Sequence, residues 1–208
     1  MDSYEIGAQF LRDLKATGWV EYIAVLFGII SVYFSRKENI LVYPTGLINT
    51  TFYVYLSFKG HLLGEASVNV YYTLISIYGW WLWSKKDNQN VKVLKITYSD
   101  KKQWINQIIF FAVLYILIFF GLTYLKREFA PGAIPWADAL ASASAFTGMW
   151  LMAKKKVESW IWWIITNIVS IPLYFVKSYV FTSIYYFILL GMAVSGLIMW
   201  IKKERANA

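Results

Sequence analysis

Four side chains near the end of the chain have types and a spacing that suit ligand binding. Positions separated by four, three and four residues share one face of a helix, and here they hold Trp163, Asn167, Ser170 and Tyr174. The face offers an aromatic surface, an amide with donors and an acceptor, and two hydroxyl groups. Such a set suits a planar, partly polar ligand that is neutral or cationic. The alternative is that the amide and the serine only join helices in a membrane, each contributing about 1 kcal/mol.

A second stripe of polar and aromatic residues lies earlier in the chain, at Thr45, Asn49 and Tyr53. A shift of 118 positions places Asn49 on Asn167 and gives Thr45 the position of Trp163. After one residue of slippage, Gly79 and Trp83 match Gly196 and Trp200. We therefore expect Asn49 and Tyr53 to contribute to a binding site that is not symmetric. Packing of Asn49 against the segment that holds Asn167 is the alternative.

Tryptophans near the ends of the apolar segments have two expected roles. Trp80 follows Gly79, one turn inside the end of its segment, and we expect it to wall the cavity, with Trp150 as a further substrate contact. Trp83 and Trp200 lie at segment ends next to lysines, so we expect them in the aromatic belt at the membrane boundary.

Long apolar segments must position these side chains. Hydrophobic residues make up 59% of the 208 positions and charged residues 15%, a composition that excludes a soluble domain. A helix of about 20 apolar residues spans a bilayer because its backbone hydrogen bonds close internally. Seven such segments are expected, at residues 19–34, 40–58, 66–83, 104–125, 136–153, 159–176 and 180–201.

The connections between the segments indicate a three, one, three arrangement. Short connections join segments one to three and five to seven, whereas longer polar stretches set the fourth apart. A single segment between two triplets gives both triplets the same orientation. We therefore predict an all-α integral membrane protein with two parallel triple-helix repeats and a linker helix, as in SWEET-type transporters. The predicted divisions are 1–18 (extracytoplasmic or interfacial segment), 19–83 (first repeat), 84–103 (cytoplasmic loop), 104–125 (linker helix), 136–201 (second repeat) and 202–208 (cytoplasmic tail).

The distribution of lysine and arginine predicts the orientation in the membrane. Fourteen of the twenty basic residues fall on one side of the seven segments and six on the other. By the positive-inside rule, the N-terminus lies outside and the C-terminus in the cytoplasm, which agrees with an odd number of spans. The net charge of +8 therefore reflects topology and not nucleic-acid binding.

Several chemistries lack the residues that they need. The chain has no cysteine and one histidine, so metal catalysis and a Ser-His-Asp triad are not expected, and neither are a cofactor or an ATP-binding loop. The two acidic residues within the spans, Glu21 and Asp138, lie near the outer surface. Because ion coupling normally places an acid at the midplane, we expect a uniporter. Pro172 interrupts the sixth span, either as a hinge for alternating access or as a static kink.

Three motifs of this chain resemble the PnuC family of bacterial nicotinamide riboside transporters. They are residues 43–49, 78–83 and, above all, 154–174, and the likeness runs over residues 21–203. The resemblance implies facilitated diffusion of nicotinamide riboside, an NAD precursor, by alternating access across the bacterial inner membrane. It further implies that a cytoplasmic nucleoside kinase traps the product, and that the protein forms a homotrimer, as related transporters often do.

The resemblance also implies that Trp163, Asn167 and Tyr174 recognise the substrate. A tryptophan face attracts a pyridinium cation by about 1–2 kcal/mol when desolvated, and an asparagine pairs with a carboxamide or a ribose hydroxyl. A phosphorylated mononucleotide would require Arg or Lys inside the spans, which contain neither. Many members of the family carry glutamine before the tryptophan of the fifth span, where this chain has Met149 before Trp150. Thiamine or riboflavin is therefore an alternative substrate, and a membrane subunit that transports nothing is an alternative of another class.

Overall fold

The structure, a computed structural model, is a bundle of helices. It describes all residues except 1–2, 60–62, 88, 90–92, 127–131 and 208. The helices of this part of the chain are α1 (Ser3–Ala16), α2 (Trp19–Arg36), α3 (Val42–Lys59), α4 (Leu63–Ser84), α5 (Lys101–Leu125), α6 (Pro135–Ala153), α7 (Ser159–Val176) and α8 (Val180–Asn207). Helices α2 to α8 occupy the seven apolar stretches of the sequence. The polar N-terminal stretch also forms a helix, α1, which packs against α8.

Local signals in the sequence set several of the helix ends. Asp100 caps α5, because its side chain accepts a hydrogen bond from the Gln103 N–H at 2.7 Å while the Gln103 side chain accepts from the Asp100 N–H. Pro135 begins α6, where its fixed φ suits the first helical position. Pro172 lies inside α7, yet the helix continues to Val176.

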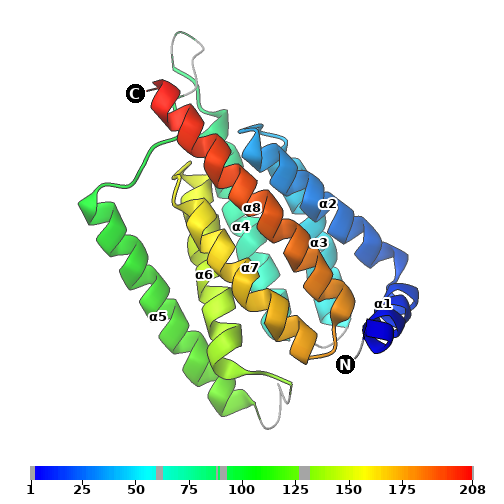
Figure 1. Cartoon of the computed structure of the whole chain (residues 1–208). Coiled ribbons are helices and arrows are strands. Elements are labelled where there is room, and N and C mark those ends of the chain that lie inside the picture. The colour runs from blue at the N-terminus through cyan, green and yellow to red at the C-terminus, as the bar shows by residue number, and fades with distance from the viewer. Residues whose placement is uncertain (1–2, 60–62, 88, 90–92, 127–131, 208) are drawn as a thin grey trace.

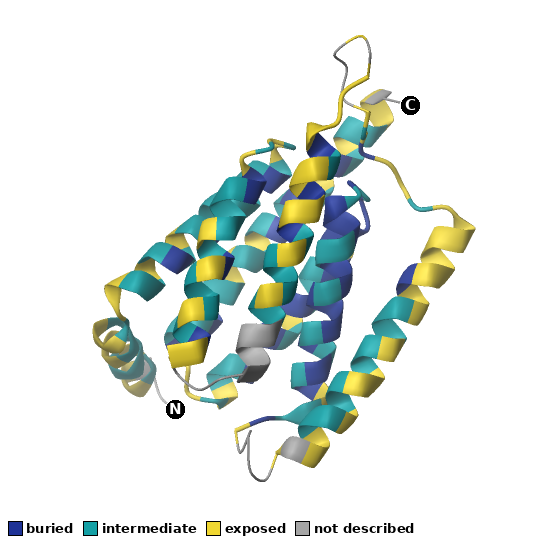
Figure 2. Cartoon of the chain, turned by 180° about the vertical axis from the view of Figure 1, so that it is seen from behind, coloured by how far each residue is buried: buried dark blue, intermediate teal, exposed yellow. Residues whose placement is uncertain are grey.

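The helices pack in two groups of three. Helices α2, α3 and α4 contact one another in sequence, as do α6, α7 and α8 (Figure 1). The groups meet where α2 contacts α8 and where α4 contacts α6. Helix α5 packs against α6, and its Gln107 and Phe111 also contact Trp162 of α7. Buried alanines such as Ala139, Ala143 and Ala145 allow close packing around α6. Figure 2 shows buried residues in the middle of the bundle and a largely exposed α5.

Four of the described helices, α2, α5, α7 and α8, are long and apolar enough to cross a membrane. On α5, large apolar side chains such as Ile109 and Leu117 are 56% and 63% exposed, as expected for a surface that faces lipid. Helices α3, α4 and α6 carry hydroxyl groups, amides and small residues, which lower their hydropathy. Length and composition therefore identify four clear candidate spans.

Contacts in the two groups of helices match at a shift of 117 positions. The first set consists of Tyr43, Gly79 and Trp83, and the second of Trp160, Gly196 and Trp200. In each set the first ring lies against the glycine and meets the tryptophan edge to face, with centroids 5.2 and 5.6 Å apart. A Cβ on either glycine would lie 2.5 or 2.6 Å from that ring, so only glycine permits the approach.

Trp83 and Trp200 lie in the core, so the prediction that they anchor the protein at the membrane boundary is wrong. They are 3% and 0% exposed, and their rings are 6.1 Å apart. Each indole N–H donates to the end of a helix in the other group, Trp83 to the Ala153 carbonyl and Trp200 to the Ser35 carbonyl, both at 3.1 Å. The N–H of each ring thus satisfies a helix-end carbonyl, which draws the tryptophan inward.

A buried ion pair joins the two groups at the same end of the bundle. The Lys155 side chain, 1% exposed, donates to Glu38 at 2.7 Å and to the Leu94 carbonyl at 2.9 Å. Lys203 adds a second ion pair to Glu38 at 3.1 Å. Burial alone would raise the pKa of Glu38, but the hydrogen bonds and charges of the two lysines outweigh it and hold that pKa below its ordinary value. The turns that follow α2 and α6 are therefore held together by opposite charges.

Candidate substrate-binding site

Helix α7 turns its polar face into the bundle. Asn167 and Ser170 are 3% and 2% exposed, and Trp163 and Tyr174 on the same face are half-buried. The opposite face of α7 carries exposed apolar side chains such as Ile168. The helix therefore orients itself in the ordinary way for a membrane bundle, with the apolar face outward and the polar face inward.

The Asn167 amide and the Ser170 hydroxyl have no hydrogen-bond partner among the described residues. A buried polar group without a partner costs about 1–3 kcal/mol, so proteins keep few of them without a functional reason. Both residues retain a small accessible surface, so a molecule of the size of water can reach them. They are therefore available to bind a ligand.

Asn49 lies in a contact between two helices. Its Nδ2 donates to the Ala24 carbonyl of α2 at 2.7 Å, so the amide joins two helices. In the other group, the Thr166 hydroxyl makes the corresponding bond to the Ala141 carbonyl at 3.4 Å, again at a shift of 117. The sequence shift of 118, which placed Asn49 on Asn167, is therefore wrong by one residue. Asn49 therefore packs between helices, against α2 and not against α7.

Trp163 has no counterpart in the first group of helices. The indole lies against Gly148, where a Cβ would be 3.3 Å from Cδ1 and Nε1 of the ring. At a shift of 117 the matching pair is Gly46 and Ser31, with a Gly46 Cβ 3.1 Å from the Ser31 hydroxyl. Gly46, not Thr45, thus holds the place of Trp163. The large aromatic surface is present on one side only.

Two tyrosines from other helices complete an aromatic frame. Trp163 of α7 lies 6.3 Å from Tyr72 of α4, and Tyr174 of α7 stacks on Tyr186 of α8 at 5.2 Å and 12°. These contacts place one tyrosine of α4 and one of α8 beside the polar face of α7. The two unpaired polar groups of α7 lie between Trp163 and Tyr174.

The frame can bind a flat ring with polar substituents. Its aromatic faces attract an apolar or cationic ring, and the amide and hydroxyl can pair with a carboxamide or a sugar hydroxyl. None of its six residues carries a formal charge: Trp163, Asn167, Ser170 and Tyr174 of α7, Tyr72 of α4 and Tyr186 of α8. Sequence reasoning missed Tyr72 and Tyr186, because aromatics make up 20% of the chain and nothing local distinguishes these two. Among the described residues, no group of histidine and acidic side chains could hold a metal ion.

The other expected site residues lie elsewhere. Trp80 is 40% exposed on α4, and Tyr53 is partly buried in α3. Trp150 packs against Phe110 of α5 at 5.0 Å, with the Lys154 ammonium 4.2 Å from its ring centroid. No ring contact or hydrogen bond between described residues joins Trp80 or Trp150 to the polar face of α7.

Comparison with known proteins bears on this site and fold. A family model described as "Nicotinamide mononucleotide transporter" matches residues 18–202. The nicotinamide riboside transporter PnuC of Escherichia coli (strain K12) is 28% identical, and the alignment covers 90% of this chain and 87% of the relative. The riboflavin/roseoflavin transporter RibM of Streptomyces davaonensis is 22% identical, with 91% of this chain and 88% of the relative covered.

A solved structure, "Crystal structure of the Vitamin B3 transporter PnuC", has the same fold. It aligns with a TM-score of 0.73 at 24% identity, over 98% of this chain and 89% of that chain. These relatives are membrane transporters and not enzymes. The resemblance expected from the sequence motifs is confirmed, because the family model covers nearly the whole chain: this multi-pass membrane protein belongs to the PnuC, or nicotinamide mononucleotide transporter, family.

Proposed function

We propose that this protein imports nicotinamide riboside by uniport, through alternating access. The observation that carries the proposal is the buried pair Asn167 and Ser170, which have no hydrogen-bond partner among the described residues and lie on α7 between Trp163 and Tyr174, each of which contacts a further tyrosine ring. The E. coli relative, a nicotinamide riboside transporter, supports this choice of substrate. The substrate is a pyridinium cation with a carboxamide and a ribose, and each of these parts has a matching group in the site.

In this proposal the aromatic frame holds the pyridinium ring. The faces of Trp163 and its neighbours attract the cation, each by about 1–2 kcal/mol when water is excluded. Asn167 pairs with the carboxamide, and Ser170 donates to a ribose hydroxyl. Tyr174, stacked on Tyr186, closes the side of the site that faces α8.

The site favours the riboside over the mononucleotide, although the family model is described by the latter. A phosphate requires charge-assisted hydrogen bonds from Arg or Lys, and none of the six residues is cationic. A cytoplasmic kinase that phosphorylates the riboside would therefore trap it, since the product no longer fits. Riboflavin is the second candidate, because RibM covers 91% of this chain and a flat neutral ring also suits the frame. Thiamine, a cationic aromatic, has the same chemical requirements.

We further propose seven spans in a three, one, three arrangement of two parallel repeats. Helices at all seven apolar stretches and matched contacts at a shift of 117 support it. The lysine and arginine distribution supports an outside N-terminus and a cytoplasmic C-terminus in the bacterial inner membrane. Asp138 is paired with Lys177 at 2.7 Å, beside Tyr174 at the end of α7, and its charge is thereby balanced within the protein, which supports uniport without ion coupling. We also propose a homotrimer and a hinge at Pro172.

Isothermal titration of the purified protein in detergent tests the substrate. Nicotinamide riboside, the mononucleotide, thiamine and riboflavin are titrated separately under the same conditions. Binding of the riboside alone supports the proposal. Binding of riboflavin or thiamine alone assigns the same site to the alternative substrate, whereas tighter binding of the mononucleotide refutes the argument from charge. Counterflow of labelled riboside in proteoliposomes without an ion gradient then tests uniport.

A further inference from the structure

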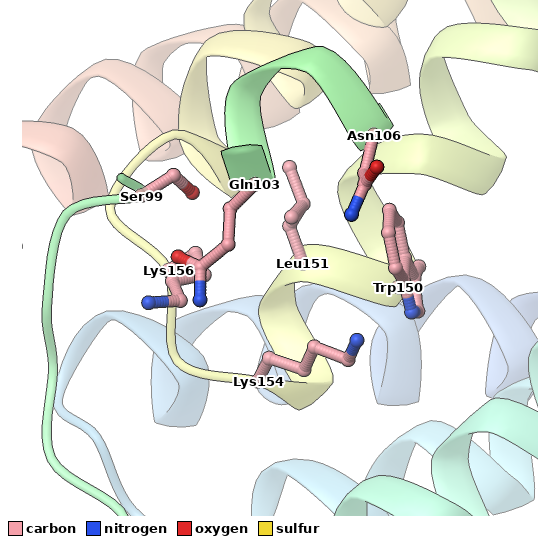
Figure 3. A pocket seen from close by; sticks show the side chains of 7 residues that line it. All are labelled: Ser99, Gln103, Asn106, Trp150, Leu151, Lys154 and Lys156. Atoms are coloured by element: carbon pink, nitrogen blue, oxygen red, sulfur yellow. The ribbon is translucent and has the colours of Figure 1, made fainter. Parts of the chain in front are cut away.

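A small cavity lies between the first turns of α5 and the end of α6 (Figure 3). It measures about 70 Å³. Polar side chains and one indole line most of it: Ser99, Gln103, Asn106, Trp150, Lys154 and Lys156. Trp150 faces this cavity and α5, so the cavity is separate from the proposed substrate site.

The lining of the cavity contains two cations and no carboxylate. Lys154 forms no ion pair with a described residue, and its ammonium lies 4.2 Å from the centroid of the Trp150 ring. Lys156 donates to the Thr97 hydroxyl at 2.9 Å and to the Tyr98 carbonyl at 3.2 Å, which are both neutral. Burial lowers the pKa of Lys154, and the nearby charge of Lys156 lowers it further. The cavity therefore has excess positive charge.

The nearest acidic side chains are already engaged. Glu158 accepts hydrogen bonds from the Ser99 N–H at 2.8 Å and from its hydroxyl at 3.3 Å. Asp100 accepts from the Gln103 N–H at 2.7 Å and so caps α5. Neither carboxylate forms an ion pair with a described lysine of the cavity. An anion from outside the chain would balance the charge.

Donors from both helices converge on this space. Figure 3 shows the side chains of Gln103 and Asn106 reaching from α5 toward α6, opposite Lys154 and Trp150. Two amides and an ammonium around one small space are the donor set that a phosphate or another oxyanion accepts.

The position of the cavity identifies the source of the anion. Asn106 of the cavity begins a stripe on α5 that continues through Ile109 and Val113, which are 56% and 51% exposed. Helix α5 contacts α6 and α7 through Phe110, Gln107 and Phe111, whereas Ile109 and Val113 are exposed, so this stripe faces the acyl chains of the bilayer. A polar, basic cavity at the end of such a stripe lies at headgroup depth, where tryptophan is also favoured and where basic pockets between helices bind anionic lipids.

We propose that this cavity binds the phosphate of an anionic phospholipid, whose acyl chains lie along α5. In that complex Lys154 provides the charge, Gln103 and Asn106 donate to phosphate oxygens, and the lipid joins α5 to α6. The proposal stands independently of the transported substrate.

Native mass spectrometry of the delipidated protein with added phosphatidylglycerol tests it. We expect Lys154→Gln to weaken binding about tenfold, because one charge-assisted hydrogen bond is lost. Lys154→Arg should retain binding. Lys102→Gln should also retain it, because Lys102 is an exposed lysine next to Gln103 in the first turn of α5 and does not line the cavity. An unchanged thermal unfolding midpoint of Lys154→Gln without lipid shows that the fold is intact.

Three outcomes would overturn the proposal. Equal weakening by Lys154→Gln and Lys102→Gln would mean diffuse attraction to the membrane surface. Equally tight binding of phosphatidylcholine and phosphatidylglycerol would mean that the cavity does not select a lipid with a net negative charge. Displacement of the lipid by millimolar inorganic phosphate would assign the cavity to free phosphate.

Discussion

Replacing each of two asparagines by leucine separates ligand binding from helix packing. The Asn167 amide is buried and has no partner among the described residues, whereas the Asn49 amide donates to the Ala24 carbonyl at 2.7 Å. Leucine has the same branching and number of side-chain heavy atoms as asparagine, so neither change opens a large cavity. The two variants should therefore fail in opposite ways.

The expected magnitudes follow from these contacts. Asn167→Leu removes a buried amide whose lack of a partner costs about 1–3 kcal/mol, so stability without ligand should stay the same or rise. The bound substrate then buries a polar group without a partner, which should weaken binding by a similar amount, about 5- to 150-fold in Kd. Asn49→Leu removes a hydrogen bond between membrane helices and should destabilise the protein by about 1 kcal/mol, with a smaller effect on Kd.

Thermal unfolding in detergent and isothermal titration measure both effects. Each variant is unfolded with and without saturating nicotinamide riboside, and its Kd is compared with that of the wild type. Asn167→Leu should lose most of the ligand-induced rise in Tm, and Asn49→Leu should keep it. A lower Tm of Asn167→Leu without ligand, together with wild-type affinity, would refute the assignment and make Asn167 a packing residue.

The end of the bundle that holds the matched tryptophans allows three further predictions. Glu38→Gln leaves Lys155 buried without a counter-charge and should destabilise the protein by about 3–5 kcal/mol. The Lys203 side chain is 37% exposed, so Lys203→Gln should cost less than about 1 kcal/mol. Urea or SDS titration measures both losses of stability. Since the pKa of Glu38 in the folded protein lies below its ordinary value of 4.5, this stabilisation is present above pH 4.5 and is lost as the pH falls through the lower folded pKa. The difference in Tm between wild type and Glu38→Gln should therefore shrink in acid, and a constant difference would contradict the ion pair. Gly196→Ala places a Cβ 2.6 Å from the packed indole and should cost about 1–3 kcal/mol, while Gly121→Ala, in open space, should be neutral or mildly stabilising.

The sequence predicts the helices and the polar face of α7 well because both are local properties. Apolar length in a bilayer specifies a helix, and α7 begins and ends at the expected residues. The spacing of Trp163, Asn167, Ser170 and Tyr174 fixes their common face whatever the neighbouring helices are. A single helix therefore carries most of the site that the sequence could predict.

The errors concern relations between helices. A shift of 118 aligns Asn49 with Asn167 because the two residues are of the same type. The equivalent helix–helix hydrogen bonds are made by Asn49 and Thr166, at a shift of 117, because equivalent positions in the packing need not hold the same residue. Tyr72 and Tyr186 join the site only through tertiary contacts with α7. Trp150 resembled a site residue in the sequence, yet its side of α6 faces α5.

The departures from internal symmetry are concentrated where the substrate is proposed to bind. At the end of the bundle, glycine, aromatic ring and tryptophan repeat in both groups of helices with nearly the same geometry. In the middle, the counterpart of Trp163 is Gly46, and the counterpart of Asn167 is Thr50, whose hydroxyl is already bonded to Thr73 at 2.9 Å. The proposed alternating access would move two similar halves relative to each other, which fits the matched contacts at the end of the bundle. A vitamin precursor has no twofold symmetry, so a site that recognises its ring and its sugar must differ between the halves. The chain therefore keeps its internal symmetry at the end of the bundle and loses it in the middle, where the substrate is proposed to bind.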